Sequence, residues 1–152
     1  MLKMTIKKEL YDHCYAYVNN RLQSVQNLIS EIQESLLSET KSSAGDKHET
    51  GRAMLQLERE KAGQQLAEVQ KLKETITKID LTKSSNIVCL GSLVYTTQSN
   101  YFISISAGKF TVGNIDFFAI SPNTPIGQLL LSKQVGNKVV FRNQNFNITN
   151  IL

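Results

Sequence analysis

Cysteines are scarce in this sequence and long apolar runs are absent, and each lack excludes a class of protein. The two cysteines, Cys14 and Cys89, have no Cys or His partner at metal-ligand spacing, which argues against a zinc site or a disulfide framework. Both are expected to be buried free thiols. No stretch reaches the length of a membrane span, and the opening residues lack the features of a signal peptide. A cytoplasmic protein without a membrane partner is therefore expected.

Acidic residues are nearly absent from the second half of the chain. Residues 81–152 contain five basic residues and one acidic residue, Asp116, whereas residues 1–80 contain 12 of each sign. The formal charge of +4 therefore belongs to the second half. A mildly basic domain is compatible with an acidic protein partner or with nucleic acid, DNA included. The basic residues form no run, so the sequence provides no basis for asserting phosphate binding.

The first 80 residues carry two helical patterns, from about Thr5 to Glu39 and from about His48 to Ile79, separated by a polar break. Because the connection is short, the two segments are predicted to fold back as an antiparallel coiled-coil hairpin, roughly 50 Å long. One such hairpin buries its own seams, so a monomer is expected. The predicted seam residues are Val18, Leu22, Val25, Ile29, Ile32 and Leu36, followed by Leu55, Ala62, Leu66, Val69, Leu72, Ile76 and Ile79.

Residues 81–152 form the second predicted domain, which starts with a hinge at residues 81–86 and continues with the alternating pattern of a strand-rich domain. Four or five short strands are predicted, and Thr124 followed by Pro125 indicates one short helix. The second domain is therefore predicted to be α+β, a small antiparallel sheet packed on one helix, with a last hairpin turning at residues 142–145. The aromatic group near the start of the first helix, which includes His13, is expected to pack against this domain.

The polar break, SSAGDKHETGR at residues 42–52, holds two acids three residues apart, Asp46 and Glu49. Two interpretations are open for them. An Asp-x-x-Glu pair at a helix start forms a capping box, in which each side chain accepts from a main-chain N–H of the other residue. Alternatively, both carboxylates are offered to a metal ion at the end of the hairpin. Gly51 would let the tip flex or approach another surface closely.

The hairpin, its acidic tip and a domain containing ISPNTPIGQLLLSKQVGNKV together resemble the bacterial transcript-cleavage elongation factors, the GreA/GreB family. Residues 120–139 are similar to the family's short strand, Ser-Pro-Ile-Gly-type turn and Leu-rich helix ending in Lys. They depart from it where Asn137 replaces an acid and where Ser132 precedes Lys133 in place of a glycine. The tip matches at Gly45, Asp46 and Glu49, but Arg52 stands where the family commonly has a third acid.

This resemblance implies an FKBP-like second domain that docks on the rim of RNA polymerase and a hairpin that enters its secondary channel. The chain would not be an enzyme on its own. It would stimulate cleavage by the polymerase at the nascent RNA 3′ end, with Asp46 and Glu49 supplying carboxylates to a second Mg²⁺ shared with the polymerase. The candidate RNA contacts are Lys47, His48 and Arg52, and the candidate polymerase contacts are Ser121, Asn123, Pro125, Ile126 and Gly127.

Other functions and simpler structural roles remain open. The segment from Ser121 to Gly127 has the composition of an ordinary rigid turn. Arg52 and the electrically neutral hairpin favour a regulator that occupies the same polymerase channel without stimulating cleavage. An FKBP-like domain also suggests a prolyl isomerase or a peptide-binding chaperone, whose pocket needs clustered aromatic residues. Residues 81–152 contain eight aromatic residues but no Trp.

Overall fold

The computed structural model describes the backbone of residues 2–41 and 45–152 and the side chains of residues 5–39 and 49–152. The chain divides into two compact units. One is Val18–Lys73, and the other joins Met1–Tyr17 to Glu74–Leu152. The predicted boundary at residues 80 and 81 lies between the end of the second helix at Thr77 and the start of the first strand at Leu93, whereas the units divide within the helices. No helix in the described part of the chain has both the length and the apolar character needed to cross a membrane.

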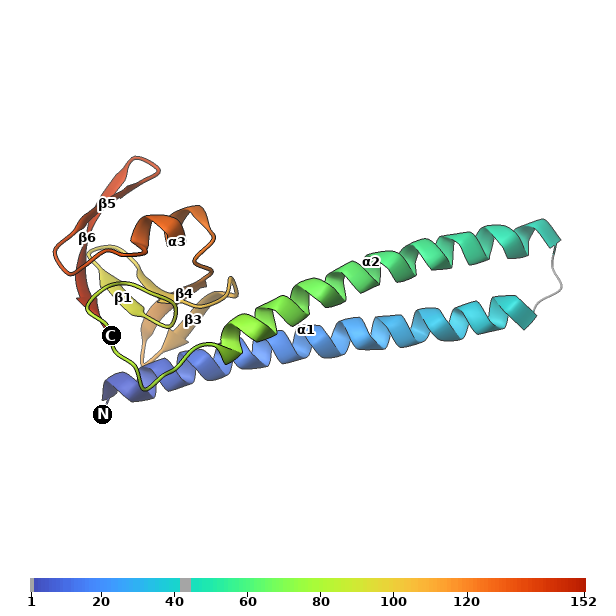
Figure 1. Cartoon of the computed structure of the whole chain (residues 1–152), viewed down its shortest axis with the longest axis horizontal. Coiled ribbons are helices and arrows are strands. Elements are labelled where there is room, and N and C mark those ends of the chain that lie inside the picture. The colour runs from blue at the N-terminus through green and yellow to red at the C-terminus, as the bar shows by residue number, and fades with distance from the viewer. Residues whose placement is uncertain (1, 42–44) are drawn as a thin grey trace. The chain divides into compact units, whose positions relative to one another are not determined.

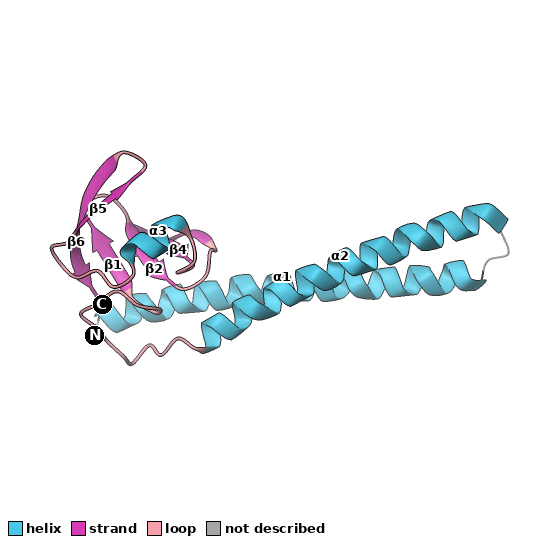
Figure 2. Ribbon diagram, turned by 45° about the horizontal axis from the view of Figure 1, so that its top comes forward, coloured by secondary structure: helices cyan, strands magenta, loops and turns pink. Residues whose placement is uncertain are grey.

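The unit Val18–Lys73 is an antiparallel pair of helices, taken from α1 (Leu2–Lys41) and α2 (Gly45–Thr77), which lie side by side in both views (Figures 1 and 2). The helices bury residues at intervals of three, four and seven, the spacing of a coiled-coil seam. The other predicted seam leucines are half-buried. The predicted hairpin and its seam are confirmed. The buried residues of this unit are Val18, Val25, Ile29, Ile32, Ala62 and Val69.

The helices are longer than the sequence pattern indicated, and the polar break is shorter. The helix α2 begins at Gly45 and not near His48, so most of the predicted break is its first two turns. Acidic side chains are favourable at the positive end of the helix dipole, and strong helix formers follow in residues 54–61. These effects outweigh the helix-weakening Ser, Thr and Gly content that predicted a break.

The strand-rich unit holds a six-stranded sheet in the order β3-β4-β2-β1-β6-β5 and one short helix, α3 (Pro125–Leu130). Neighbouring strands are antiparallel except β2 and β4, which pair in parallel with Phe102 opposite Ala119. The predicted sheet and helix are confirmed, with six strands and one parallel pair in place of four or five antiparallel strands. The strands are β1 (Leu93–Thr96), β2 (Asn100–Ile103), β3 (Gly108–Val112), β4 (Ile115–Ile120), β5 (Lys138–Phe141) and β6 (Gln144–Ile151).

An apolar cluster between the sheet and α3 forms the core of this unit, and the first turns of α1 add to its burial. Leu10 and Cys14 are buried, and Cys14 Sγ lies 3.6 Å from Ser104 Oγ. The expected aromatic packing occurs where the His13 ring stacks on Phe110, with ring centroids 5.0 Å apart. Burial raises the pKa of the Cys14 thiol to about 11. The prediction of two buried thiols was wrong for Cys89, which is exposed. The cluster contains Val88, Val94, Ile103, Leu130, Val139, Phe146 and Ile148.

The hairpin of β5 and β6 turns at Arg142 and Asn143, within the predicted segment. Their φ angles are 52° and 64°, as in the two-residue type I′ turn. Asn tolerates this left-handed conformation and Gly adopts it freely, whereas Ala is strained there by about 1 kcal/mol. Asn143→Ala is therefore expected to lower the free energy of unfolding by about 1 kcal/mol in urea denaturation. Asn143→Gly is the control and should unfold with the same free energy as the wild type. An equal decrease in this free energy in both variants would contradict the type I′ turn.

Candidate functional site at the helical tip

The candidate site lies in the first two turns of α2, where the backbone of Asp46 and Glu49 is helical. Residues three apart in a helix share a face, with Cβ atoms about 5–6 Å apart. The Glu49 side chain is exposed. The side chains of Asp46, Lys47 and His48 lie outside the described residues, so their predicted contacts stay predictions. The backbone nevertheless places the two acids on one face near the helix N-terminus.

A third acid, Glu39 of α1, lies against α2 beside this site. A Cβ built on Gly51 would stand 3.2 Å from Glu39 Oε1 and 3.3 Å from its Cδ. Gly51 therefore makes room for a carboxylate of the opposite helix, which agrees with its predicted role in a close approach. Sequence reasoning missed Glu39, because it lies outside the polar break. The signal that could have found it is the unusual Gly in the first turns of a long helix, which implies a close neighbour.

Arg52 follows Glu49 by three residues in α2 and is half-buried, with an interaction of its own. Its guanidinium is always charged, so it adds a fixed positive charge one turn from the exposed carboxylate of Glu49. The net charge of the tip is consequently less negative than the two predicted acids alone would make it. Any role that depends on attraction of a cation rests on Asp46, Glu49 and the newly found Glu39.

Among the residues that the structure describes, no group of three or more His, Cys, Asp or Glu side chains is placed to hold a metal ion. Mg²⁺ prefers six oxygen ligands and commonly takes one or two carboxylates from a protein. Glu49 is exposed and shares a helical face with Asp46. The two residues could therefore provide one or two carboxylate ligands to an ion that is held mainly by another molecule.

The contact between Gly51 and Glu39 yields a stability prediction. Gly in a helix interior costs about 0.5–1 kcal/mol relative to Ala. Gly63→Ala, whose new Cβ would meet one guanidinium nitrogen of Arg59 at 3.2 Å, is expected to gain that amount in urea denaturation. Gly51→Ala should gain less, because three atoms of Glu39 lie within 3.4 Å. When Glu39 is also replaced by alanine, Gly51→Ala should give the full increase in the free energy of unfolding. If the effects of the two substitutions on this free energy simply add, the contact is contradicted.

The predicted polymerase-binding segment forms a hydrogen-bonded turn that leads into α3. Thr124 Oγ1 donates to the Ser121 carbonyl at 2.7 Å and accepts from the Gly127 N–H at 3.0 Å, so it caps α3 as predicted. Asn123 and Pro125 are exposed, Ser121 and Ile126 are half-buried, and Gly127 is buried. A partner that meets this turn as it is folded would therefore touch Asn123 and Pro125 first.

Aromatic residues that could line an isomerase pocket are instead packed inside the strand-rich unit. Phe102 and Phe117 have no exposed surface, and Tyr95 meets Phe117 edge-on with ring centroids 5.7 Å apart. Two cavities of the strand-rich unit are lined without any aromatic residue. No observation on the described residues favours the isomerase hypothesis.

Comparisons with known proteins give matches in structure and none in sequence. No family model matches the chain, and no curated protein matches it in sequence. The fold is similar to a solved structure described as that of the transcription factor Gfh1, at 16% sequence identity and a TM-score of 0.35. The match covers 90% of this chain and 92% of that one. A TM-score of this size is too low to transfer a role to this chain.

Proposed function

We propose that this chain is a transcription factor that enters the secondary channel of RNA polymerase and stimulates cleavage of backtracked RNA. The observation that carries the proposal is the pair Asp46 and Glu49 on one face of α2, next to the point where the antiparallel helices connect. A long, narrow pair of helices is suited to carry carboxylates into a channel that a compact domain cannot enter. The polymerase does the cutting, and this chain supplies side chains to its catalytic centre.

The carboxylates have complementary roles in this proposal. A pair of bound Mg²⁺ ions activates water and stabilises the leaving oxygen in phosphodiester hydrolysis. Asp46 would help to hold the second Mg²⁺, and Glu49 would orient or deprotonate the attacking water. The two roles are exchangeable, because the residues share a helical face. A capping role is compatible with both, since a cap would hold the acids in place until the polymerase is engaged.

A non-cleaving regulator of the same polymerase channel is the second candidate, and Arg52 favours it. Its fixed positive charge, one turn from Glu49, opposes the binding of a further cation. Such a protein would exclude cleavage factors from the channel without shortening RNA. Its surface requirements are otherwise the same, so binding to polymerase does not distinguish the two candidates.

RNA length in a backtracked elongation complex separates the two candidates. The complex is built from the cognate polymerase with Mg²⁺ and incubated with and without the protein, while binding is followed by co-migration with polymerase. The proposal expects shorter RNA when the protein is present. Binding without shortening would establish the regulator in its place, and a protein that does not bind polymerase would refute both.

A further inference from the structure

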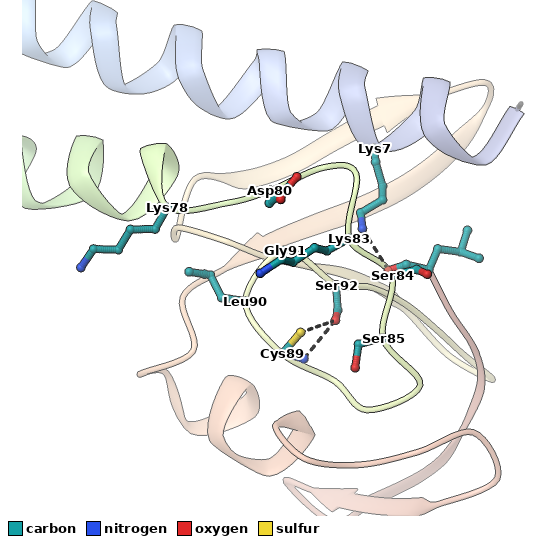
Figure 3. Close-up of a pocket in the computed structure, with 11 residues that line it drawn as sticks. Lys7, Lys78, Asp80, Lys83, Ser84, Ser85, Cys89, Leu90, Gly91 and Ser92 are labelled. Carbon is teal, nitrogen blue, oxygen red and sulfur yellow. Dashed lines mark hydrogen bonds between the residues drawn. The ribbon is translucent and has the colours of Figure 1, made fainter.

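A cavity of about 330 Å³ lies in the strand-rich unit, between the first turns of α1, the segment that follows α2 and the turn that precedes β1 (Figure 3). Its volume is at the lower end of the range for small-molecule sites, about 300–1,000 Å³. Three lysines line it, Lys7, Lys78 and Lys83, together with one acid, Asp80. The lining side chains therefore carry more positive than negative charge, and Lys7 is far in the sequence from Lys78, Asp80 and Lys83.

Lys7 is the buried cation of this cavity. It is only 5% exposed, and its Nζ donates to the main-chain oxygen of Leu152 at 3.2 Å. An ammonium group has three N–H donors, and this is its one hydrogen bond within the described residues. Burial lowers the pKa of the Lys7 ammonium, with smaller opposing effects of Cys89 and Asp80. A buried cation with spare donors is stabilised by an anion that enters beside it.

The surrounding groups complete an anion site. Lys83 and the hydroxyl of Ser84 are exposed, and Ser85 is half-buried. Lys78 extends away from the other lining side chains in Figure 3, so Lys7 and Lys83 are the cations available to one ligand. The one acidic residue of the lining, Asp80, is hydrogen-bonded within its own loop. Its Oδ1 accepts from the N–H and the hydroxyl of Thr82, at 2.9 and 2.5 Å.

The turn at residues 89–92 forms a shaped and partly apolar wall of the cavity. Ser92 Oγ accepts from the Cys89 N–H at 3.0 Å, and Gly91 has a φ of 92°, which favours glycine. These contacts hold the turn while Leu90, half-buried, lines the cavity. Cationic and hydroxyl groups therefore occupy one part of the site, and an apolar side chain is available to the rest of a ligand.

We propose that this cavity binds a small phosphate monoester, an organic molecule that carries a phosphate group. Lys7 and Lys83 contact the phosphate oxygens, the Ser84 and Ser85 hydroxyls donate to them, and the organic part lies against Leu90. The proposal is independent of any action on RNA polymerase, because it concerns a different part of the chain. It is tested on the protein alone, so its failure leaves the tip hypothesis untouched.

Calorimetric titration of the full chain at low salt tests the site with defined probes. The probes are AMP, glucose 6-phosphate and inorganic phosphate, with adenosine and glucose as their uncharged counterparts. At least one ester should bind with one-to-one stoichiometry and more tightly than inorganic phosphate, and the uncharged compounds should not bind. Failure of both esters to bind more tightly than inorganic phosphate would overturn the proposal.

Matched lysine variants locate the binding. Lys83→Gln should raise the Kd of the ester at least tenfold, because it removes a charge-assisted hydrogen bond at an exposed position. Lys138→Gln, which removes the same charge from an exposed position on β5, should leave the Kd unchanged. An equal increase in Kd in the Lys83→Gln and Lys138→Gln variants would show that the ester is attracted non-specifically, and it would refute the site. Lys7→Gln should also weaken binding, and Lys83→Gln keeps the test decisive if Lys7→Gln does not fold.

Discussion

The Asp46→Asn, Glu49→Gln variant is expected to bind RNA polymerase like the wild type and to shorten backtracked RNA at least about a hundredfold more slowly. Loss of a positioned acid or base typically costs a factor of 10²–10⁴ in rate. Both substitutions keep the size of the side chains and remove only the charges. The measurement is the rate of RNA shortening in the elongation complex, at protein concentrations that saturate the polymerase.

The matched control for this result is Glu31→Gln with Glu34→Gln. These two exposed acids of α1 have the same three-residue spacing, and their removal changes the net charge by the same amount. The control should cleave like the wild type. Equal slowing in both double variants would mean that net charge, and not the position of the acids, controls activity. Circular dichroism should show both helices intact, because charges at a helix end contribute only about 0.3–1 kcal/mol each.

Gly127→Ala is expected to be the most destabilising single change in the predicted polymerase-binding turn. A Cβ at this position would stand 2.3 Å from the Ser121 carbonyl oxygen and 2.8 Å from Thr124 Oγ1. The first atom belongs to the main chain, so the turn and the cap of α3 would both have to move. Overpacking of this kind costs on the order of 3 kcal/mol, a fall in Tm of roughly 10 °C.

Thermal denaturation checks the prediction for Gly127, with Gly63→Ala as the control. The control introduces the same methyl group inside α2, where its one close neighbour is a flexible arginine side chain. Opposite changes in Tm are therefore expected for the two variants. A Gly127→Ala protein as stable as the wild type would contradict the close approach of Gly127 to the Ser121 carbonyl oxygen.

Local patterns predicted the parts of the fold that local interactions determine. The spacing of Val18, Val25, Ile29 and Ile32 marks a helical stripe, whatever the rest of the chain does. Thr124 before Pro125 indicated the cap and start of α3 because both effects act within one turn. The turn of the last hairpin was likewise located from the short polar segment between two apolar strands.

Features that depend on distant residues were not visible in the sequence. The parallel pairing of β2 with β4 follows from which strands meet across the sheet, and alternation alone does not encode that choice. The meeting of Glu39 with Gly51 is also a contact between different helices. The cavity around Lys7 draws on four separate parts of the sequence. Its lysines form no run, so charge patterning could not reveal them.

The edge strands of the sheet bear on how copies of this protein behave at high concentration. The strands β3 and β5 are the two edges, and both have open hydrogen-bonding groups along one side. Each edge carries an exposed lysine: Lys138 on β5, and Lys109 on β3, which forms an ion pair with Asp116 of β4 at 3.8 Å. A second copy that added its own edge strand would bring like charges together and strip them of water. Charged side chains at both edges therefore oppose growth of the sheet by strand addition.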